Sequence, residues 1–404
     1  MSRWSRAAPV LGAVAFLVVA PPQAFADSVP NLPSGDKCLP PPVASAGTVP
    51  WAQQLLAPQR VWPLTRGAGV TVAVVDTGVD GSAPQLAGRV LPGRDVHNPG
   101  NHRADNDCFG HGTFVAGIIA AAPAAGTMFA GVAPDATVLP IRVIENASDT
   151  SADTLATGIR AAVDAGARVI NVSASTQAPD PNIDAAVAYA ASRDVLIIAS
   201  AGNDAQQGNP TPYPASNPSV LAVGAIDQTG KRASFSQTGG YMGLTAPGVD
   251  VCSLGPGGPG QWQASGTSYA APFVSGVAAL VRAYHPTLTA PQVLHRLEAT
   301  ADRPPANAPD PGFGWGTVNP LAAVTAILPE EGPLGAVAAA APPPAPAPRP
   351  IVPDEITGLL VTLSVLGTAL VAAAVCLAVR LVPSGMRRRW RPARRVAVVS
   401  TEEF

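Results

Sequence analysis

Four short motifs place residues with the chemistry of acyl transfer at separate points of the sequence. An apolar run ending at Val75 leads directly into Asp76, which is followed by Thr-Gly-Val. His111 stands in Gly-His-Gly-Thr-Phe-Val-Ala-Gly, and Ser268 stands in Gly-Thr-Ser-Tyr-Ala-Ala-Pro. The motif Ser-Ala-Gly-Asn ends at Asn203 and also follows an apolar run. These are the residue types that a hydroxyl nucleophile needs around it.

The expected roles follow from the chemistry. A serine hydroxyl becomes an effective nucleophile when a neighbouring imidazole takes its proton, and a carboxylate on the other ring nitrogen keeps that imidazole in the correct tautomer. We therefore expect Ser268 as nucleophile, His111 as general base and Asp76 as the orienting carboxylate. Negative charge then develops on the attacked oxygen, and the Asn203 amide with the backbone N–H of Ser268 are the expected donors to it.

Each motif also has a simpler structural interpretation. Asp76 and Ser268 could each cap a helix. His111 could mark a turn or bind a metal, and Asn203 could stand in a turn. If all four simple interpretations were correct, four unrelated residues would have to appear by chance in the order Asp, His, Asn, Ser. Such a coincidence is improbable, so the catalytic interpretation is favoured.

The elements that must position these residues are predicted between residues 59 and 327. Five strand-like runs are predominantly apolar, at 70–75, 138–144, 168–172, 195–200 and 220–225. Helix-like segments lie among them at 113–122, 152–165 and 183–192, and a later one follows at 268–284. Such a pattern is typical of an α/β fold with a central, mostly parallel sheet covered on both faces. Active sites of such sheets collect at the strand ends, where Asp76 and Asn203 stand.

The N-terminus predicts export. Arg3 and Arg6 precede a short apolar stretch at residues 10–20, and Ala24-Phe-Ala26 fits a secretory cleavage site. We expect residues 1–26 to be a signal peptide, with an uncleaved anchor as the alternative. The segment 27–58 is rich in Pro, Gly and Ser and is expected to have no core of its own.

The C-terminus predicts a membrane anchor. Residues 356–379 are uncharged and long enough for one transmembrane helix, and residues 328–355 before them form an Ala/Pro-rich linker. Acidic residues precede the span and an arginine-rich tail, 380–404, follows it. The tail should therefore be cytoplasmic and residues 27–355 should lie outside the membrane. The alternative, a buried core helix, would not explain the charged residues on both sides of the apolar segment.

Composition agrees with this topology. Charged residues make up only 13 % of the chain and the mean hydropathy is +0.22, values that the two apolar segments explain. The arginine run could suggest nucleic-acid binding. Its position beside a membrane span instead favours retention and contact with anionic lipid, so no nucleic-acid partner is expected.

Three cysteines are expected in the exported part. Cys376 falls within the predicted span, which leaves Cys38, Cys108 and Cys252 in an oxidising compartment. We expect a disulfide between Cys38 and Cys108, with Cys252 as a buried free thiol. The pairings of residue 252 with 38 or 108 remain open from sequence.

The four motifs resemble those of the subtilisin-like serine proteases, whose triad has the order Asp, His, Ser. The resemblance covers residues 59–325, and it includes Pro272 after the expected nucleophile. It implies a subtilisin-like, three-layer peptidase domain at 59–327 that hydrolyses peptide bonds, with Asp76, His111 and Ser268 as the triad. Asn203 then resembles the oxyanion-hole asparagine.

The layout of the whole chain is similar to that of the mycosins, proteases associated with type VII secretion systems of actinobacteria. This resemblance implies a membrane-anchored serine endopeptidase that acts on exported proteins, with components of the secretion complex as partners. It also implies an alternative role as a structural component of that complex, with secondary or vestigial proteolysis. In mycosins the N-terminal extension wraps around the catalytic domain, where a Cys38–Cys108 bridge would hold it near His111.

Two departures from subtilases are visible. About 30 residues separate the signal peptide from the domain, too few for an inhibitory pro-domain. The strand expected to pair with substrate includes Ser173, Ala174 and Ser175, and glycine is commoner than serine at position 175. This change alters the expected shape of the primary specificity pocket.

No cofactor or required metal is predicted. His97, His102, His285 and His295 are expected in surface or capping positions, the last two beside a turn after the Ser268 helix. Asp105 and Asp107 could contribute to a calcium site, but their ligand set is incomplete.

Overall fold

The computed structural model describes residues 29–33, 37–98, 100, 103–145, 151–304 and 307–331. The predicted signal peptide, the segment 356–379, Cys376, His102 and the basic tail lie outside these residues. Within them, no helix is both long and apolar enough to cross a membrane.

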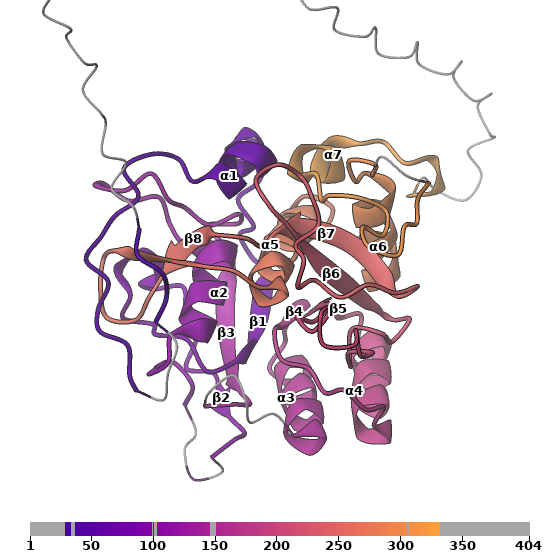
Figure 1. Ribbon diagram of the computed structural model, residues 1–404, viewed down its shortest axis with the longest axis horizontal. Coiled ribbons are helices and arrows are strands. Elements are labelled where there is room, and N and C mark those ends of the chain that lie inside the picture. The colour runs from indigo at the N-terminus through magenta and orange to yellow at the C-terminus, as the bar shows by residue number, and fades with distance from the viewer. Residues whose placement is uncertain are drawn as a thin grey trace, which may run out of the picture. The chain divides into compact units, whose positions relative to one another are not determined.

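A seven-stranded sheet in the order β2-β3-β1-β4-β5-β6-β7 forms the centre of the fold (Figure 1). Every neighbouring pair in it is parallel. Its strands are β1 (Thr71–Asp76), β2 (Arg94–Asp95), β3 (Thr137–Arg142), β4 (Val169–Val172), β5 (Leu196–Ser200), β6 (Val220–Ile226) and β7 (Met242–Pro247). The sequence predicted five of them to within one or two residues. It missed β2, which is only two residues long, and β7, whose glycine and terminal proline interrupt the apolar pattern.

Helices cover both faces of the sheet. One face packs against α2 (His111–Ala120) and α5 (Thr267–Tyr284), and the other packs against α3 (Ala152–Asp164) and α4 (Pro181–Ser192). Strand β1 shows why: Val72 and Val74 belong to the first core cluster, whereas Ala73 and Val75 belong to the second. Successive side chains of a strand point to opposite faces, so a strand buried on both sides is apolar throughout. The predicted three-layer α/β architecture is confirmed.

Smaller elements complete the domain. They are α1 (Trp51–Leu56), α6 (Ala290–Ala299), α7 (Pro320–Thr325), the antiparallel pair β8 (Val251–Leu254) and β9 (Gln261–Ala264), and the 3₁₀ turns η1 (Pro58–Arg60), η2 (Pro84–Leu86) and η3 (Pro329–Glu331). Helix α6 begins in a capping box formed by Thr289 and Gln292. His295 lies inside this helix, after the turn that joins α5 to α6, and its side chain is exposed, as predicted.

The described residues before position 59, 29–33 and 37–58, are attached to the domain at several points. The backbone N–H of Leu32 donates to the Gln263 carbonyl at 2.7 Å, and the N–H of Leu39 donates to the Cys108 carbonyl at 2.8 Å. Ala52 and Leu56 of α1 are buried in the common core. The extension therefore has no core of its own, as expected, but it contributes to the core of the domain.

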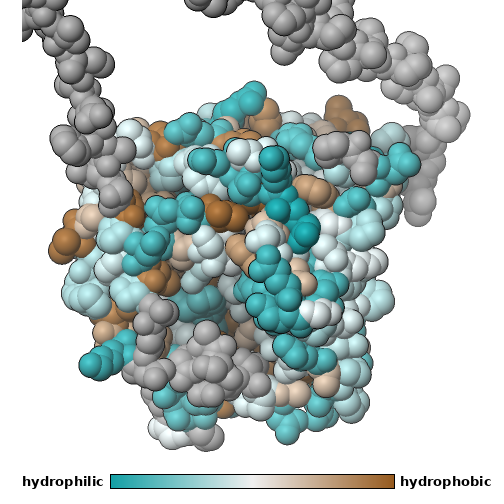
Figure 2. Space-filling view, in the orientation of Figure 1, coloured by the Kyte–Doolittle hydropathy of each residue, from teal (hydrophilic) through white to brown (hydrophobic). Residues whose placement is uncertain are grey.

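The predicted disulfide between Cys38 and Cys108 is present, and it joins residues 70 positions apart. Cys252 is a free, buried thiol, and burial raises its pKa to about 12. On the face shown in Figure 2, hydrophobic residues are scattered among hydrophilic ones.

Replacing both Cys38 and Cys108 with serine should lower the free energy of unfolding by about 4 kcal/mol, because a loop of this size would no longer be closed in the unfolded chain. Urea unfolding of the full-length protein measures this. Dithiothreitol should lower the midpoint of the wild-type chain and leave that of the double variant unchanged. Equal midpoints for both proteins without reductant would contradict the prediction.

Candidate active site

Asp76 ends β1, in the middle of the sheet, and its side chain is fully buried. Its Oδ1 accepts a hydrogen bond from the backbone N–H of Thr77 at 2.8 Å. The same oxygen lies 2.6 Å from Nδ1 of His111. The two groups that the sequence placed 35 residues apart are therefore in direct contact.

His111 is the first residue of α2, and both neighbouring glycines are sterically required. Gly110 has φ +80°, and a Cβ there would lie 2.5 Å from Cδ1 of Leu39. A Cβ on Gly112 would lie 1.9 Å from the carbonyl oxygen of Gly78. The helix can thus approach the end of β1 closely enough for the histidine to meet Asp76.

The imidazole is poised to gain and lose a proton. Burial lowers the pKa of His111, but the charge of Asp76, its hydrogen bond and the charge of Asp107 together raise this pKa above its ordinary value of 6.5. The side chain of His111 is still 20 % exposed, and its ring centroid lies 5.1 Å from that of Tyr269. Solvent and ligands can therefore reach this histidine.

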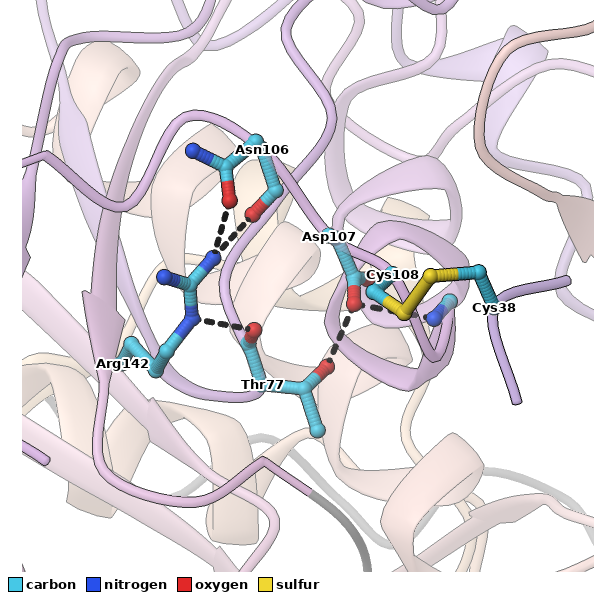
Figure 3. Close-up of a disulfide and its surroundings, with 7 residues drawn as sticks. Cys38, Thr77, Asn106, Asp107, Cys108 and Arg142 are labelled. Carbon is cyan, nitrogen blue, oxygen red and sulfur yellow. Dashed lines mark hydrogen bonds between the residues drawn. A yellow bond between two sulfur atoms is a disulfide. The ribbon is translucent and has the colours of Figure 1, made fainter. Parts of the chain in front are cut away.

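Asp107 holds the loop that carries His111 (Figure 3). Its buried carboxylate accepts from the Thr77 hydroxyl at 3.0 Å and from the N–H of Gly110 at 2.9 Å. It also accepts from the N–H and the hydroxyl of Thr113, at 2.8 and 2.7 Å. One carboxylate thus ties the end of β1 to the first turn of α2. Cys108, adjacent in sequence, fixes the same loop to the extension.

Arg142, at the end of β3, supports this loop from the other side. Its guanidinium donates to the Thr77 carbonyl at 2.9 Å and to the carbonyl and side-chain oxygens of Asn106 (Figure 3). It also pairs with Asp95 of β2 at 2.7 Å. The residues on either side of the Asp76–His111 contact are therefore fixed by buried hydrogen bonds.

From its sequence context Asp107 was predicted only as a possible calcium ligand, and its positioning role was missed. In the structure the four hydrogen bonds of Asp107 hold the loop before α2. Asp105, in contrast, forms an ion pair with Arg103. No group of three or more potential metal ligands occurs in the described part of the chain. The position of Asp107 four residues before His111 was the available signal, because a carboxylate there can cap α2.

Ser268 is the second residue of α5 and is half-buried. Its hydroxyl donates to the Ser173 carbonyl at 3.3 Å. Among the hydrogen bonds of the described residues, none joins Ser268 directly to His111. The next residue, Tyr269, packs against the His111 ring, so the serine and the histidine share one neighbourhood.

Asn203 follows β5 and is anchored to the start of α5. Its Oδ1 accepts from the N–H of Thr267 at 2.8 Å and from the Thr267 hydroxyl at 3.0 Å. These bonds occupy the oxygen and leave the amide nitrogen as donor beside the serine-bearing turn. Nδ2 lies 3.7 Å from the point that a Cβ on Gly266 would occupy.

The segment Ser173, Ala174 and Ser175 continues from β4 without joining the sheet. Ala174 is buried and Ser175 is exposed. The following residue, Thr176, pairs with Tyr213 through two backbone hydrogen bonds, at 3.0 and 2.9 Å. The predicted substrate-binding segment is thus held at both ends and lies next to Ser268.

The other histidines have structural contacts. Nε2 of His285 lies 2.8 Å from the Val324 carbonyl, and this histidine caps the C-terminus of α5. His295 lies 2.8 Å from Glu330 on the surface.

A family model of the subtilases matches residues 67–316 of this chain. The chain belongs to the subtilase family. This subtilase is 39 % identical over 386 residues to Mycosin-4 of Mycobacterium tuberculosis, covering 84 % of this chain and 82 % of that protein. It is 34 % identical over 336 residues to Mycosin-1 of Mycolicibacterium smegmatis, covering 70 % and 74 %. Members of the family are serine proteases, and this enzyme is one.

Solved structures agree with this assignment. The MycP3 protease of the type VII (ESX-3) secretion system matches with a TM-score of 0.63 and 34 % identity, over 77 % of this subtilase and 98 % of that chain. MycP1, described as a serine protease and an essential component of the type VII (ESX-1) secretion system, matches with a TM-score of 0.63 and 32 % identity, over 76 % and 100 %.

Replacing Asp107 with alanine should destabilise the protein by about 3–5 kcal/mol, because the donors from Thr77, Gly110 and Thr113 lose a buried charged acceptor. Urea unfolding measures the loss. The matched control is Asp105→Asn, two residues away in a partly exposed ion pair with Arg103, which should change stability by less than about 1 kcal/mol. Similar effects of both substitutions would show that Asp107 does not hold the loop.

Proposed function

We propose that this chain is a membrane-anchored serine endopeptidase that cuts exported proteins beside a type VII secretion complex. Asp76, His111 and Ser268 form its catalytic triad. The observation that carries this proposal is the buried contact of 2.6 Å between Asp76 and Nδ1 of His111. It lies at the end of a central strand, in the neighbourhood of a serine at a helix N-terminus.

The arrangement supports attack by Ser268 on a peptide carbonyl. Asp76 on Nδ1 keeps that nitrogen protonated, so Nε2 is free to take the serine proton. Rotation of the Ser268 hydroxyl away from the Ser173 carbonyl lets it approach Nε2. The resulting imidazolium is stabilised by Asp76 and returns the proton to the leaving amine. Water then hydrolyses the acyl-enzyme with His111 again acting as base.

Two donors serve the developing oxyanion. Nδ2 of Asn203 is directed by the two bonds that hold its oxygen, and the backbone N–H of Ser268 lies in the first turn of α5. Removing an asparagine donor costs about 3 kcal/mol of transition-state stabilisation, a magnitude measured in a subtilisin.

The segment Ser173 to Ser175 is suited to bind the substrate. It lies outside the sheet and stands next to Ser268, so a peptide can add to it as a further strand. Ser175 is exposed beside this path, where a glycine would leave more room. We infer that this serine narrows the primary specificity pocket.

The location is inferred from the sequence and the relatives. The signal peptide at 1–26 and the transmembrane segment at 356–379 would place the domain outside the membrane, with the linker 328–355 as spacer and the tail 380–404 in the cytoplasm. Mycosin-like proteases are associated with type VII secretion, and two matching structures are described in those terms. Exported proteins are the substrates that this location supplies.

A fluorophosphonate probe tests the activity of the full-length chain. The wild-type protein should be labelled on Ser268, because the probe requires an activated serine, and Ser268→Ala should remove the label. Ser219→Ala, which deletes an exposed serine hydroxyl just before the N-terminal end of β6, should keep the wild-type labelling and is the control. A wild-type chain that resists the probe would refute the proposal.

The rate of labelling should fall at acidic pH. The base must be neutral, and the pKa of His111 is raised by Asp76 and Asp107, so activity should be lost as pH falls through a value above 6.5. Asp76→Asn removes the largest raising cause. This variant should lose labelling activity at a lower pH than the wild-type protein does, and its rate should be reduced by roughly 10⁴-fold. An unchanged acidic side of the pH–rate profile in this variant would contradict the assignment of His111 as base.

A second candidate function is a structural role in the secretion complex, favoured by the description of a relative as an essential component of such a system. Complementation of a deletion strain separates the two functions. If catalysis is required, Ser268→Ala fails to restore secretion although the protein accumulates normally. If the structural role is sufficient, Ser268→Ala restores secretion whereas a chain truncated after residue 331 does not.

A further inference from the structure

The carbonyl group of Ser268 lacks the partner that a helix normally provides. In α5 this group would accept from the N–H of residue 272, but that residue is Pro272 and has no N–H. The hydroxyl of Ser173 takes the vacant position and donates to the Ser268 carbonyl at 3.2 Å. The proposed nucleophile is therefore held from outside its own helix.

Two further side chains determine where the Ser173 hydroxyl points. Nδ2 of Asn171, in β4, donates to Oγ of Ser173 at 2.9 Å. The hydroxyl of Ser275 donates to Oδ1 of Asn171, also at 2.9 Å. An amide nitrogen can only donate, so Ser173 accepts from it and keeps its own hydrogen for Ser268. The donors thus run in one direction, from Ser275 through Asn171 and Ser173 to the carbonyl of Ser268.

The first two members of this chain are inaccessible to solvent. Asn171 and Ser275 are both 0 % exposed. Ser275 lies two helical turns after Ser268, on the same face of α5, and this face is directed at the end of β4. A buried amide without partners is costly, so Asn171 and Ser275 specify each other's orientation.

We propose that Asn171 and Ser275 are positioning residues for the nucleophile. Asn203, after β5, fixes the peptide group before Ser268 through the N–H of Thr267. The chain from Ser275 fixes the carbonyl group after it. The peptide groups on both sides of Ser268 are then anchored to the ends of two adjacent strands before substrate binds. This anchoring lowers the entropic cost of aligning the Ser268 hydroxyl with the substrate carbonyl. This inference rests on the proposed function, in which Ser268 attacks.

The experiment measures labelling of the full-length chain by a fluorophosphonate probe as a function of probe concentration. Ser275→Ala should lower the rate at saturation by about tenfold, because a slightly misplaced nucleophile reacts slowly. The half-saturating concentration should stay within about twofold, because probe binding does not use this chain.

The matched control is Thr245→Val in β7. Thr245 is also 0 % exposed, and its hydroxyl bonds the Gly316 carbonyl at 3.3 Å and the Thr317 hydroxyl at 3.2 Å. This variant should lose thermal stability, as Ser275→Ala does, and keep the wild-type labelling rate. Equal slowing by both substitutions would show a general structural effect and overturn the proposal.

A double-mutant cycle tests the order of the chain. Combining Asn171→Ala with Ser275→Ala should slow labelling no further than Asn171→Ala alone, because both remove one connected path. Additive effects would overturn the proposal. If Asn171→Ala does not fold, Ser275→Ala decides alone: a saturating rate within about twofold of wild type refutes the positioning role and leaves the proposed function intact. A wild-type chain that does not react at all refutes both.

Discussion

The contact between Asp76 and His111 is the interaction on which the rest of the site depends. A carboxylate removed from water at the end of β1 is unfavourable unless a partner stabilises its charge. The imidazole 2.6 Å away provides that partner, and the charge of Asp76 in turn raises the pKa of His111. The structure around the pair serves to maintain this distance. Asp107 ties the strand end to the histidine helix, and the glycines beside His111 permit the close approach.

The parallel sheet explains how residues far apart in sequence can meet. Strands β1, β4 and β5 are neighbours that all end at one edge, and they bring Asp76, Ser173 and Asn203 to it. Helix α5 lies across the sheet with its N-terminus at this edge, and it carries Ser268. Each chemical group thus lies at a strand end, within three residues after one, or in the first turn of a helix. Helices and strands hold side chains more rigidly than loops do. This rigidity suits a site whose groups must be aligned before substrate binds.

The extension adds a constraint from outside the sheet. Cys38 is bonded to Cys108, and Leu39 contacts the position of Gly110 while its N–H bonds the Cys108 carbonyl. A segment with too few residues for its own core therefore stabilises the loop between Asp107 and His111. In this way the extension and the histidine helix depend on each other.

Much of this could be predicted from the sequence, and the exceptions have physical causes. Strands buried on both faces are predominantly apolar, so β1 and β3–β6 were recognisable, whereas the two-residue β2 has no such signature. The residue types of Asp76, His111, Ser268 and Asn203 are visible as motifs because their chemistry is local. The role of Asp107 had a local signal, its place just before α2, but the roles of Asn171 and Ser275 had none. Their hydrogen bonds depend on which elements the fold brings together. Pro272 was seen as part of a family pattern, but its effect on the Ser268 carbonyl needs the partner from β4.

The most direct measurement is a crystal structure of the protein after reaction with a fluorophosphonate. We predict that the phosphorus atom is bonded to Oγ of Ser268. Its phosphoryl oxygen should lie about 3 Å from Nδ2 of Asn203 and from the backbone nitrogen of Ser268, with Nε2 of His111 facing the site. A phosphorus atom on another residue, or an adduct on Ser268 with His111 turned away from Asp76, would contradict the central claim that folding unites these groups into one catalytic site.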